Sequence, residues 1–203
     1  MNYKIALIKG DGIGPEVVGE AVKVMDTIGA KFGHTFEYAD ILMGGCAIDQ
    51  VGKSYPEGTA EQCKTCDAVL LGAVGGPKWG HSTDPDKRPE TALLSIRKDL
   101  GLYANLRPAA LRPALADACP LKKETADKGI DLMMVRELTG GIYFGKKDRY
   151  QTEDRGEEAS DLLAYSEKEI ERIGRRAFEL AQLRSKKLAS VDKANVLESS
   201  RLW

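Results

Sequence analysis

Residues 3–28 read YKIALIKGDGIGPEVVGEAVKVMDTI, and this stretch decides the fold class of the first half of the chain. Tyr3–Ile8 is a run of residues that favour strands, and Gly10–Gly14 is a glycine-rich turn. Pro15 suits the first turn of a helix, where a missing N–H leaves nothing unpaired. Apolar residues then recur at helical spacing and predict one buried helix face, formed by Val17, Val18, Ala21, Val24, Met25 and Ile28.

The alternation of strand and helix continues to about residue 100. We expect a second strand near Phe36–Leu42, a helix from near Pro56, and a short strand at Ala68–Leu71. The last of these is wholly apolar, as strands buried in parallel sheets are. A further helix is expected around Thr91–Leu100, ending at Gly101. The pattern predicts an α/β domain with a mostly parallel sheet.

The second half of the chain has a different pattern. Strand-like runs at Tyr103–Leu106 and Ile130–Val135 flank a polar stretch that contains proline. The highly charged segment Lys146–Glu158 predicts an exposed arm or hairpin. We expect Leu188–Val191 to form a final strand and Asn195–Trp203 to begin a helix.

Between these segments, Ser166-Glu-Lys-Glu169 has the pattern of a capping box, in which the serine and the glutamate satisfy each other's backbone N–H groups. It predicts the start of an amphipathic helix. The residues of its apolar stripe are Ile170, Ile173, Ala177, Leu180 and Ala181.

Composition excludes several classes of protein. Thirty Lys and Arg residues face 31 Asp and Glu residues, and a net charge of −1 does not favour nucleic acid as a partner. The N-terminus lacks the pattern of a signal peptide, and no apolar run approaches the roughly 20 residues that span a bilayer. We therefore expect a cytoplasmic protein that does not bind membranes.

Two of the four cysteines, Cys63 and Cys66, have the CxxC spacing of metal and redox sites. No second pair follows at zinc-site distance. Because the two cysteines stand three residues apart just before an apolar strand, we favour a packed helix face over a metal site.

Two glycine-rich loops each follow a predicted strand. Gly10–Glu16 stands between a strand and a helix, where backbone N–H groups could face a phosphate. It fails as a dinucleotide-binding GxGxxG fingerprint, because Pro15 and Val17 stand where the third glycine would fall. Gly72–Trp79 follows the apolar strand, at the sheet edge where α/β proteins bind ligands, although a plain loop remains an equal alternative.

Three arginines adjoin apolar residues rather than charged runs. Arg97 lies on the predicted helix near residue 100, and Arg107 and Arg136 each follow a predicted strand. Guanidinium groups bind carboxylates through two parallel hydrogen bonds, so three converging arginines would suit a small dicarboxylate. Three unrelated structural ion pairs are the alternative reading.

Tyr143 and Lys193 also close apolar segments, within VRELTGGIYFG and VDKANVLE respectively. Neighbouring arginines would lower the pKa of either group, which is a usual route to proton transfer at neutral pH. Taken singly, a half-buried core tyrosine and a surface lysine are the commoner interpretations.

Five segments stand in the order found in the β-decarboxylating dehydrogenases of the isocitrate/isopropylmalate family, and the resemblance covers essentially all 203 residues. They are GDGIGPE, LLGAVGGPKW, ETALLSIRKDLGLYANLRPA, VRELTGGIYFG and VDKANVLE. The resemblance implies two α/β domains around a cleft, here with the C-terminal part missing. Residues 1–102 would belong to the first, cofactor-side domain, and residues 103–203 to the second, which binds substrate and dimerises. Gln151–Tyr165 resembles the family's interlocking arm, within a segment of about 146–165.

The resemblance also assigns site residues. It makes Tyr143 the acid that protonates the enol carbon after CO₂ leaves. Lys193 becomes the base that takes the hydroxyl proton, in the active site of the partner subunit. The implied substrate contacts are Arg97, Arg107 and Arg136 for the carboxylates, and Leu93, Leu94 and Val196 for the alkyl group. The implied cofactor contacts are Gly76, Pro77, Lys78, Trp79, Glu90 and Asn195.

The implied activity is the oxidative decarboxylation of 3-isopropylmalate to 4-methyl-2-oxopentanoate in leucine biosynthesis, by a homodimer that uses NAD and Mg²⁺ or Mn²⁺. The metal-binding aspartates of the family correspond to positions beyond Trp203, so we expect a fragment with no metal ligands in this chain. The alternatives are a sister enzyme acting on isocitrate, homoisocitrate or tartrate, and a non-catalytic subunit of the same fold. The apolar pair Leu93 and Leu94 favours an isopropyl group over a third carboxylate.

Overall fold

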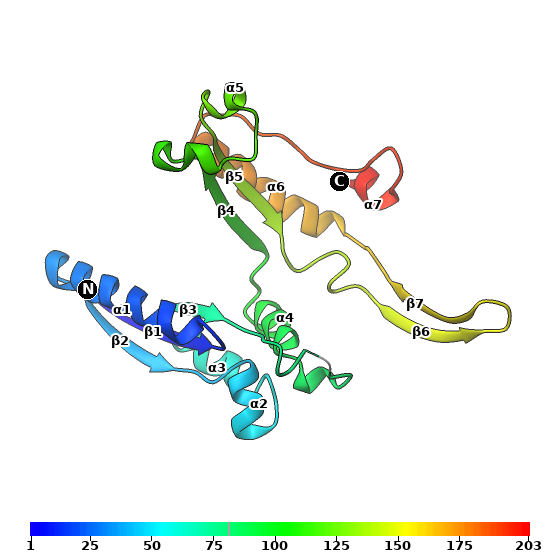
Figure 1. Ribbon diagram of the computed structural model, residues 1–203, viewed down its shortest axis with the longest axis horizontal. Helices are drawn as coiled ribbons and strands as arrows, with labels where there is room; N and C mark the ends of the chain where they lie inside the picture. The colour runs from blue at the N-terminus through cyan, green and yellow to red at the C-terminus, as the bar shows by residue number, and fades with distance from the viewer. Residues whose placement is uncertain (81) are drawn as a thin grey trace. The chain divides into compact units, whose positions relative to one another are not determined.

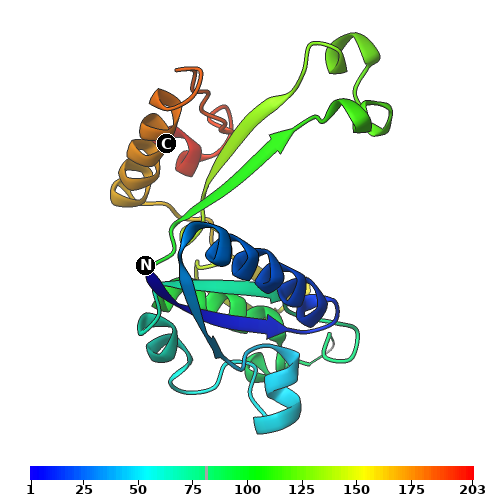
Figure 2. The same cartoon turned by 90° about the vertical axis from the view of Figure 1, so that its left-hand side faces the viewer.

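The computed structural model describes residues 1–80 and 82–203, and the chain divides into two compact units (Figures 1 and 2). Unit 1 is Met1–Gly101 and unit 2 is Leu102–Trp203. None of the helices in the described residues is long and apolar enough to cross a membrane.

Unit 1 is built on a three-stranded parallel sheet. β1 (Asn2–Gly10) lies between β2 (Thr35–Asp40) and β3 (Ala68–Ala73). Ile5 of β1 stands opposite Tyr38 of β2 on one side and Ala68 of β3 on the other. The parallel α/β pattern predicted for the first half of the chain is confirmed.

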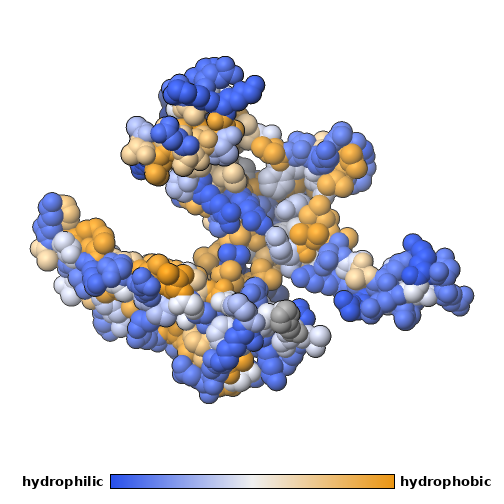
Figure 3. All heavy atoms as spheres, in the orientation of Figure 1, coloured by the Kyte–Doolittle hydropathy of each residue, from blue (hydrophilic) through white to orange (hydrophobic). Residues whose placement is uncertain are grey.

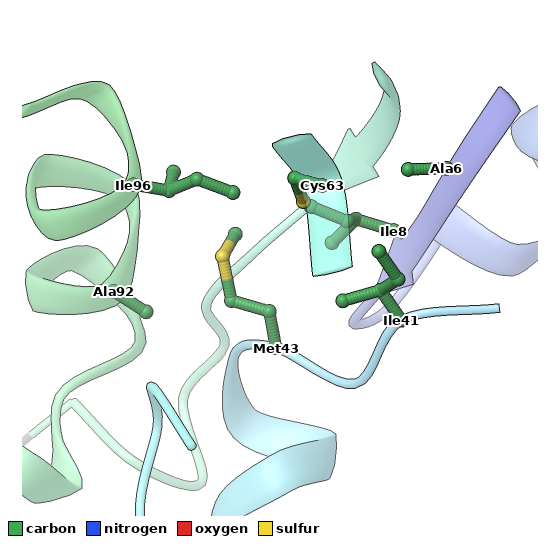
Figure 4. Close-up of a cluster of buried hydrophobic side chains, with 7 residues drawn as sticks. All are labelled: Ala6, Ile8, Ile41, Met43, Cys63, Ala92 and Ile96. Carbon is green, nitrogen blue, oxygen red and sulfur yellow. The ribbon is translucent and has the colours of Figure 1, made fainter. Parts of the chain in front are cut away.

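Helices cover both faces of this sheet, as Figure 2 shows. α1 (Gly14–Phe32) lies on one face, and α3 (Thr59–Lys64) and α4 (Pro89–Asp99) lie on the other. The connections contain α2 (Gly45–Val51) and the 3₁₀ turn η1 (Pro85–Lys87). Successive residues of a strand point to opposite faces, so β1 supplies both cores. Ile5 and Leu7 pack against Val18 of α1, whereas Ala6 and Ile8 face the other cluster. Figure 4 shows that second cluster, completed by Ile41, Met43, Cys63, Ala92 and Ile96.

The predicted apolar face of α1 is partly wrong. Val18 is buried and Met25 packs in the core beside it, but Val17, Val24 and Ile28 are exposed. Because apolar residues surround much of α1, their spacing alone could not indicate which side faces the sheet.

Cys63 is buried in the core, and Cys66 packs against the same cluster. Within the described residues, no group of three His, Cys, Asp or Glu side chains is placed to hold a metal. Both cysteines of the CxxC pair therefore pack in the core as expected, but only Cys63 does so from a helix, because α3 ends before Cys66.

Unit 2 contains two separate antiparallel pairs of strands. β4 (Ala104–Ala110) pairs with β5 (Asp131–Glu137), and the connection between them carries the short helical turns η2 (Pro113–Ala118) and α5 (Lys123–Ala126). α6 (Glu167–Gln182) packs against β5. Its capping box is present, and its predicted apolar stripe is buried or half-buried.

The predicted exposed hairpin is confirmed as β6 (Lys147–Thr152) and β7 (Gly156–Asp161). Its outer end is hydrophilic, as the blue lobe at the right of Figure 3 shows. The strand predicted at Leu188–Val191 is wrong, because none of the described strands of unit 2 pairs with that segment. The helix expected from Asn195 is shorter than predicted, and α7 spans Glu198–Leu202.

Candidate functional site

The carboxylate of Asp11 organises the glycine-rich loop that follows β1. Asp11 is 4% exposed. Its Oδ2 accepts hydrogen bonds from the backbone N–H of Gly45 at 2.7 Å and of Gly75 at 2.8 Å, and its Oδ1 accepts from Cys46 at 2.7 Å. One side chain therefore joins the start of α2 to the loop after β3. Burial and the nearby carboxylate raise the pKa of the Cys46 thiol.

The loop after β3 carries the predicted cofactor residues of unit 1. Gly75 has φ +104°, and a Cβ there would lie 2.8 Å from the Glu90 carboxylate. Trp79 packs flat against α2, since a Cβ at Gly45 would lie 2.5 Å from its ring. The structure thus brings the glycines of this loop, Trp79 and Glu90 into one region of unit 1.

Lys78 and Trp79 are joined to α2 through Asp49. The ammonium of Lys78 lies 2.7 Å from one carboxylate oxygen, and the Trp79 indole N–H donates to the other at 3.2 Å. The hydrogen bond from Lys78 holds the pKa of Asp49 below its usual range. Pro77 and Lys78 are exposed, so the outer side of the loop is open to solvent.

One side of α4 carries the remaining candidates of unit 1. Ala92 and Ile96 face the core, whereas Leu93, Leu94 and Arg97 are only half-buried. Residues four apart on a helix share a face, which places Leu93 beside Arg97.

In unit 2, two of the predicted arginines lie on one face of the β4–β5 ribbon. Asn105 stands opposite Arg136 in the register, and Arg107 lies two residues further along β4. Residues two apart on a strand point to the same face, so both guanidinium groups share a face with Asn105. The Asn105 amide oxygen accepts a hydrogen bond from Arg107 Nε at 2.7 Å.

Arg136 also meets the predicted acid. Its guanidinium lies 5.6 Å from the centre of the Tyr143 ring, within the range of a cation–π interaction. The Tyr143 residue is exposed. A guanidinium and a phenol therefore lie side by side in unit 2.

The loop between β5 and Tyr143 packs on Tyr165. A Cβ at Gly140 would lie 2.9 Å from the Tyr165 ring, and one at Gly141 would lie 2.5 Å from its hydroxyl. Glycine is therefore required at both positions for this close approach. Burial raises the pKa of Tyr165, the carboxylate of Glu137 adds to the effect, and Arg136 opposes it.

The third group of candidates lies in a turn before α7. The Lys193 carbonyl accepts hydrogen bonds from the backbone N–H of Val196 and of Leu197, both at 3.0 Å. Lys193, Asn195 and Val196 are all exposed. In the described part of unit 2, no hydrogen bond or ion pair joins this turn to Arg136 or Tyr143.

Four residues that make hydrogen bonds in these regions are missing from the sequence prediction. They are Asp11, Asn105, and the pair of Glu137 with Arg172 of α6, in which Arg172 Nη2 lies 2.6 Å from Glu137 Oε1. Asp11 stands between two glycines, and Glu137 ends an apolar strand, so each is a charged residue in a place that otherwise favours burial. That signal could have singled out these two. Nothing in the local pattern distinguishes Arg172 from the other arginines of its helix.

Comparison with known proteins agrees with the sequence motifs. The profile of the isocitrate/isopropylmalate dehydrogenase family matches residues 4–203. The chain belongs to this family.

Among its curated relatives are 3-isopropylmalate dehydrogenases from three bacteria. The chain is 54% identical over 203 residues to that of Oleidesulfovibrio alaskensis and 55% identical over 202 residues to that of Clostridium acetobutylicum. It is 57% identical over 202 residues to that of Moorella thermoacetica. These matches cover 99–100% of this chain but 56% of each relative. The chain therefore spans about half the length of these relatives.

Solved structures show the same fold. The isocitrate dehydrogenase of Methylococcus capsulatus matches with a TM-score of 0.76 and 28% identity, over 98% of this chain and 54% of that one. A β-decarboxylating dehydrogenase of Thermococcus kodakarensis matches with a TM-score of 0.66 and 34% identity, over 98% and 51% respectively.

Proposed function

We propose that this chain supplies the substrate clamp and the proton-transfer groups of a decarboxylating dehydrogenase that oxidises 3-isopropylmalate to 4-methyl-2-oxopentanoate in leucine biosynthesis. The observation that carries the proposal is the pairing of Arg136 with Tyr143, 5.6 Å apart from guanidinium to ring centre. The names of the bacterial relatives support the choice of substrate.

The arginines bind the substrate's carboxylates. Arg107 and Arg136 share one face of the β4–β5 ribbon, which suits a ligand with two negatively charged groups. Arg97 on α4 is the third arginine that the family resemblance assigns to the carboxylates. A substrate held in this way presents its C2 hydroxyl and its C3 carboxylate in a defined orientation.

Lys193 removes the proton of the C2 hydroxyl as the C2 hydride departs. The bond between C3 and its carboxylate then breaks, releasing CO₂ and leaving an enolate, and Tyr143 donates a proton to C3 to give the ketone. The exposed Lys193 is proposed to serve the site of a partner subunit in a homodimer. The exposed β6–β7 hairpin is the proposed dimerisation arm.

NAD, when bound, accepts the hydride. The loop after β3 fits such a cofactor, because Gly75 and Gly76 let the backbone approach a ligand and the exposed Glu90 carboxylate can accept hydrogen bonds from a ribose. Pro77, Lys78 and Trp79 complete the loop, and Asn195 is the proposed contact from the partner.

A divalent cation is expected from the resemblance, as Mg²⁺ or Mn²⁺. The described residues contain no cluster of three carboxylate, histidine or cysteine side chains for it, so they do not by themselves fit a metal site.

The half-buried Leu93 and Leu94 of α4, with Val196 contributed by the partner subunit, form the proposed pocket for the isopropyl group. A third carboxylate, as in isocitrate, would lie against apolar side chains there and lose its hydration without a partner. We further propose a cytoplasmic location, and no nucleic-acid or membrane partner.

The proposal is tested in a hybrid enzyme, in which this chain is followed by the remaining part of the Clostridium acetobutylicum relative. NADH formation is followed by absorbance with 3-isopropylmalate, isocitrate, homoisocitrate and tartrate, each with Mg²⁺. We expect turnover of 3-isopropylmalate and a loss on the order of 30- to 150-fold in kcat/KM in Arg136→Lys, because a point charge replaces a planar fork in a charge-assisted pair worth about 2–3 kcal/mol.

Arg175→Lys is the matched control, because that arginine is exposed on α6 and pairs only with Glu171 among the described residues. It should leave kcat and KM unchanged. A hybrid that prefers isocitrate, or that tolerates Arg136→Lys as well as Arg175→Lys, would contradict the proposed function.

A further inference from the structure

A buried carboxylate lies directly after the proposed clamp residue Arg136. The side chain of Glu137, the last residue of β5, is 1% exposed. Its Oε1 accepts hydrogen bonds from the backbone N–H of Thr139 at 3.0 Å, from the Thr139 hydroxyl at 3.2 Å and from Arg172 Nη2 at 2.6 Å. Its Oε2 accepts from Arg172 Nε at 3.3 Å. Both oxygens are therefore engaged, as a buried carboxylate requires.

Arg172 extends this network across the ribbon. Its guanidinium stacks 5.0 Å from the centre of the Tyr103 ring and donates a second bond to the Thr139 hydroxyl at 2.7 Å. The Tyr103 carbonyl in turn accepts from the backbone N–H of Leu138 at 2.7 Å. One side chain of α6 thus ties the beginning of β4 to the end of β5 and to the turn that follows.

The network lies between the two groups proposed to act on the substrate. Arg136 immediately precedes Glu137, and Tyr143 follows the turn that Thr139 begins. The far side of that turn is held by the hydrogen bond from Gly141 N–H to the Ala164 carbonyl at 2.9 Å. These hydrogen bonds therefore restrain the backbone next to Arg136 and the turn that leads to Tyr143.

We infer that Arg172, acting through Glu137, is a positioning residue that holds the Arg136 guanidinium against the Tyr143 ring. The inference deepens the proposed function and rests on it for its catalytic consequence. Neither Arg172 nor Glu137 is assigned a contact with substrate. They act on the geometry of Arg136 and Tyr143, the two residues that are proposed to contact the substrate.

A purely structural role makes a different prediction. A buried ion pair often adds little net stability compared with apolar side chains of the same volume, and breaking it lowers stability without moving the active site of the molecules that remain folded. In a positioning role, by contrast, the loss of Arg172 changes the geometry of Arg136 and Tyr143 in the molecules that remain folded. An error of about 1 Å in such a site can reduce activity on the order of 100-fold.

The first measurement uses the 203-residue chain and does not depend on activity. The Tyr143 ring should shift the NMR resonances of the Arg136 side-chain protons. Tyr143→Leu removes the ring and therefore gives the resonance frequencies of these protons without the shift. Arg172→Met should lose most of this ring-current shift while keeping a cooperative urea transition. Two controls should retain it: Arg175→Met, an exposed arginine of the same helix, and Ile173→Val, which destabilises the same buried helix face.

The second measurement is made in the hybrid enzyme. Arg172→Met should raise KM for 3-isopropylmalate and lower kcat, with a combined loss of about 10- to 100-fold in kcat/KM. Ile173→Val should leave both constants unchanged in the folded enzyme. Arg172→Lys, which keeps the charge but not the fork, should recover part of the loss in both measurements. If Arg172→Met does not fold, Arg172→Lys and Glu137→Gln replace it, and each should show a smaller change in the same direction.

Retention of the ring-current shift in folded Arg172→Met, or kinetic constants equal to those of Arg175→Met, would overturn the positioning role. If the unmutated hybrid does not oxidise 3-isopropylmalate, the proposed function fails instead. The NMR measurement then still decides whether Arg172 holds Arg136 against Tyr143.

Discussion

Replacing Asp11 by Asn should destabilise unit 1 strongly, although the side chain keeps its size. The carboxylate is buried and accepts three backbone N–H bonds of 2.7–2.8 Å, the short lengths of charge-assisted hydrogen bonds. An amide has a single acceptor oxygen, so its NH₂ group must face at least one of these N–H donors.

The magnitude follows from these three bonds. One buried donor left without an acceptor costs about 1–3 kcal/mol, and each of the two remaining bonds weakens by about 1 kcal/mol when it loses the charge. Removing a buried charge offsets part of that cost. We expect the free energy of unfolding to fall by about 3 kcal/mol in Asp11→Asn.

Urea unfolding in a Trp203→Phe background provides the assay, because the fluorescence then reports on Trp79, which packs on α2 where Asp11 binds. Asp40→Asn is the control, since its exposed pair with Lys9 is worth about 0–1 kcal/mol. Equal urea midpoints for the two variants would refute the argument that Asp11 holds the loops together.

Three further predictions concern packing, ionisation and selectivity. Gly45→Ala should destabilise the chain and shift its tryptophan emission, because the new methyl group would lie 2.5 Å from the Trp79 indole. In the control Gly174→Ala the new methyl group meets nothing within 4 Å, and the variant should add about 0.5–1 kcal/mol of stability. The pKa of Tyr38 is raised to about 12, first by burial and then by its hydrogen bond to Asp26, so Asp26→Asn should lower it toward 10.0 in a tyrosine NMR titration. The stability linked to this shift is present below pH 10.0 and is lost as the pH rises to about 12; an unchanged pKa in Asp26→Asn would contradict the cause. In the hybrid enzyme, Leu93→Ala should cost about 1–3 kcal/mol of discrimination between 3-isopropylmalate and malate, and equal losses for both substrates would place the alkyl pocket elsewhere.

Local patterns were sufficient to predict most of the elements. The strand, turn and helix of residues 3–28 could be predicted because apolar spacing, the glycines and Pro15 all favour the same structure. The α6 helix was predictable for the same reason, from its capping box and its stripe. The Leu188–Val191 run has strand propensity but no partner strand in unit 2, and propensity alone does not pair a backbone.

The networks that organise the site could not be predicted in this way. Asp11 binds residues 34, 35 and 64 positions away, and Arg172 binds Glu137 from 35 positions away. Such contacts depend on how β1, α2 and β3, or β5 and α6, come together in space. The family resemblance assigned Arg107 and Arg136 to the clamp, whereas their common face follows from the register of β4 on β5.

The most direct test of the account is the stereochemistry of protonation in the hybrid enzyme. 3-Isopropylmalate is turned over in D₂O, the product is trapped at once by reduction, and NMR determines the configuration of the deuterium at the carbon that lost CO₂. If Tyr143 donates the proton from one face, the unmutated hybrid should give a single configuration, and Tyr143→Phe should turn over more slowly and give both. A single configuration formed at an unchanged rate by Tyr143→Phe would contradict the assignment of Tyr143, and with it the clamp-and-acid arrangement that we propose.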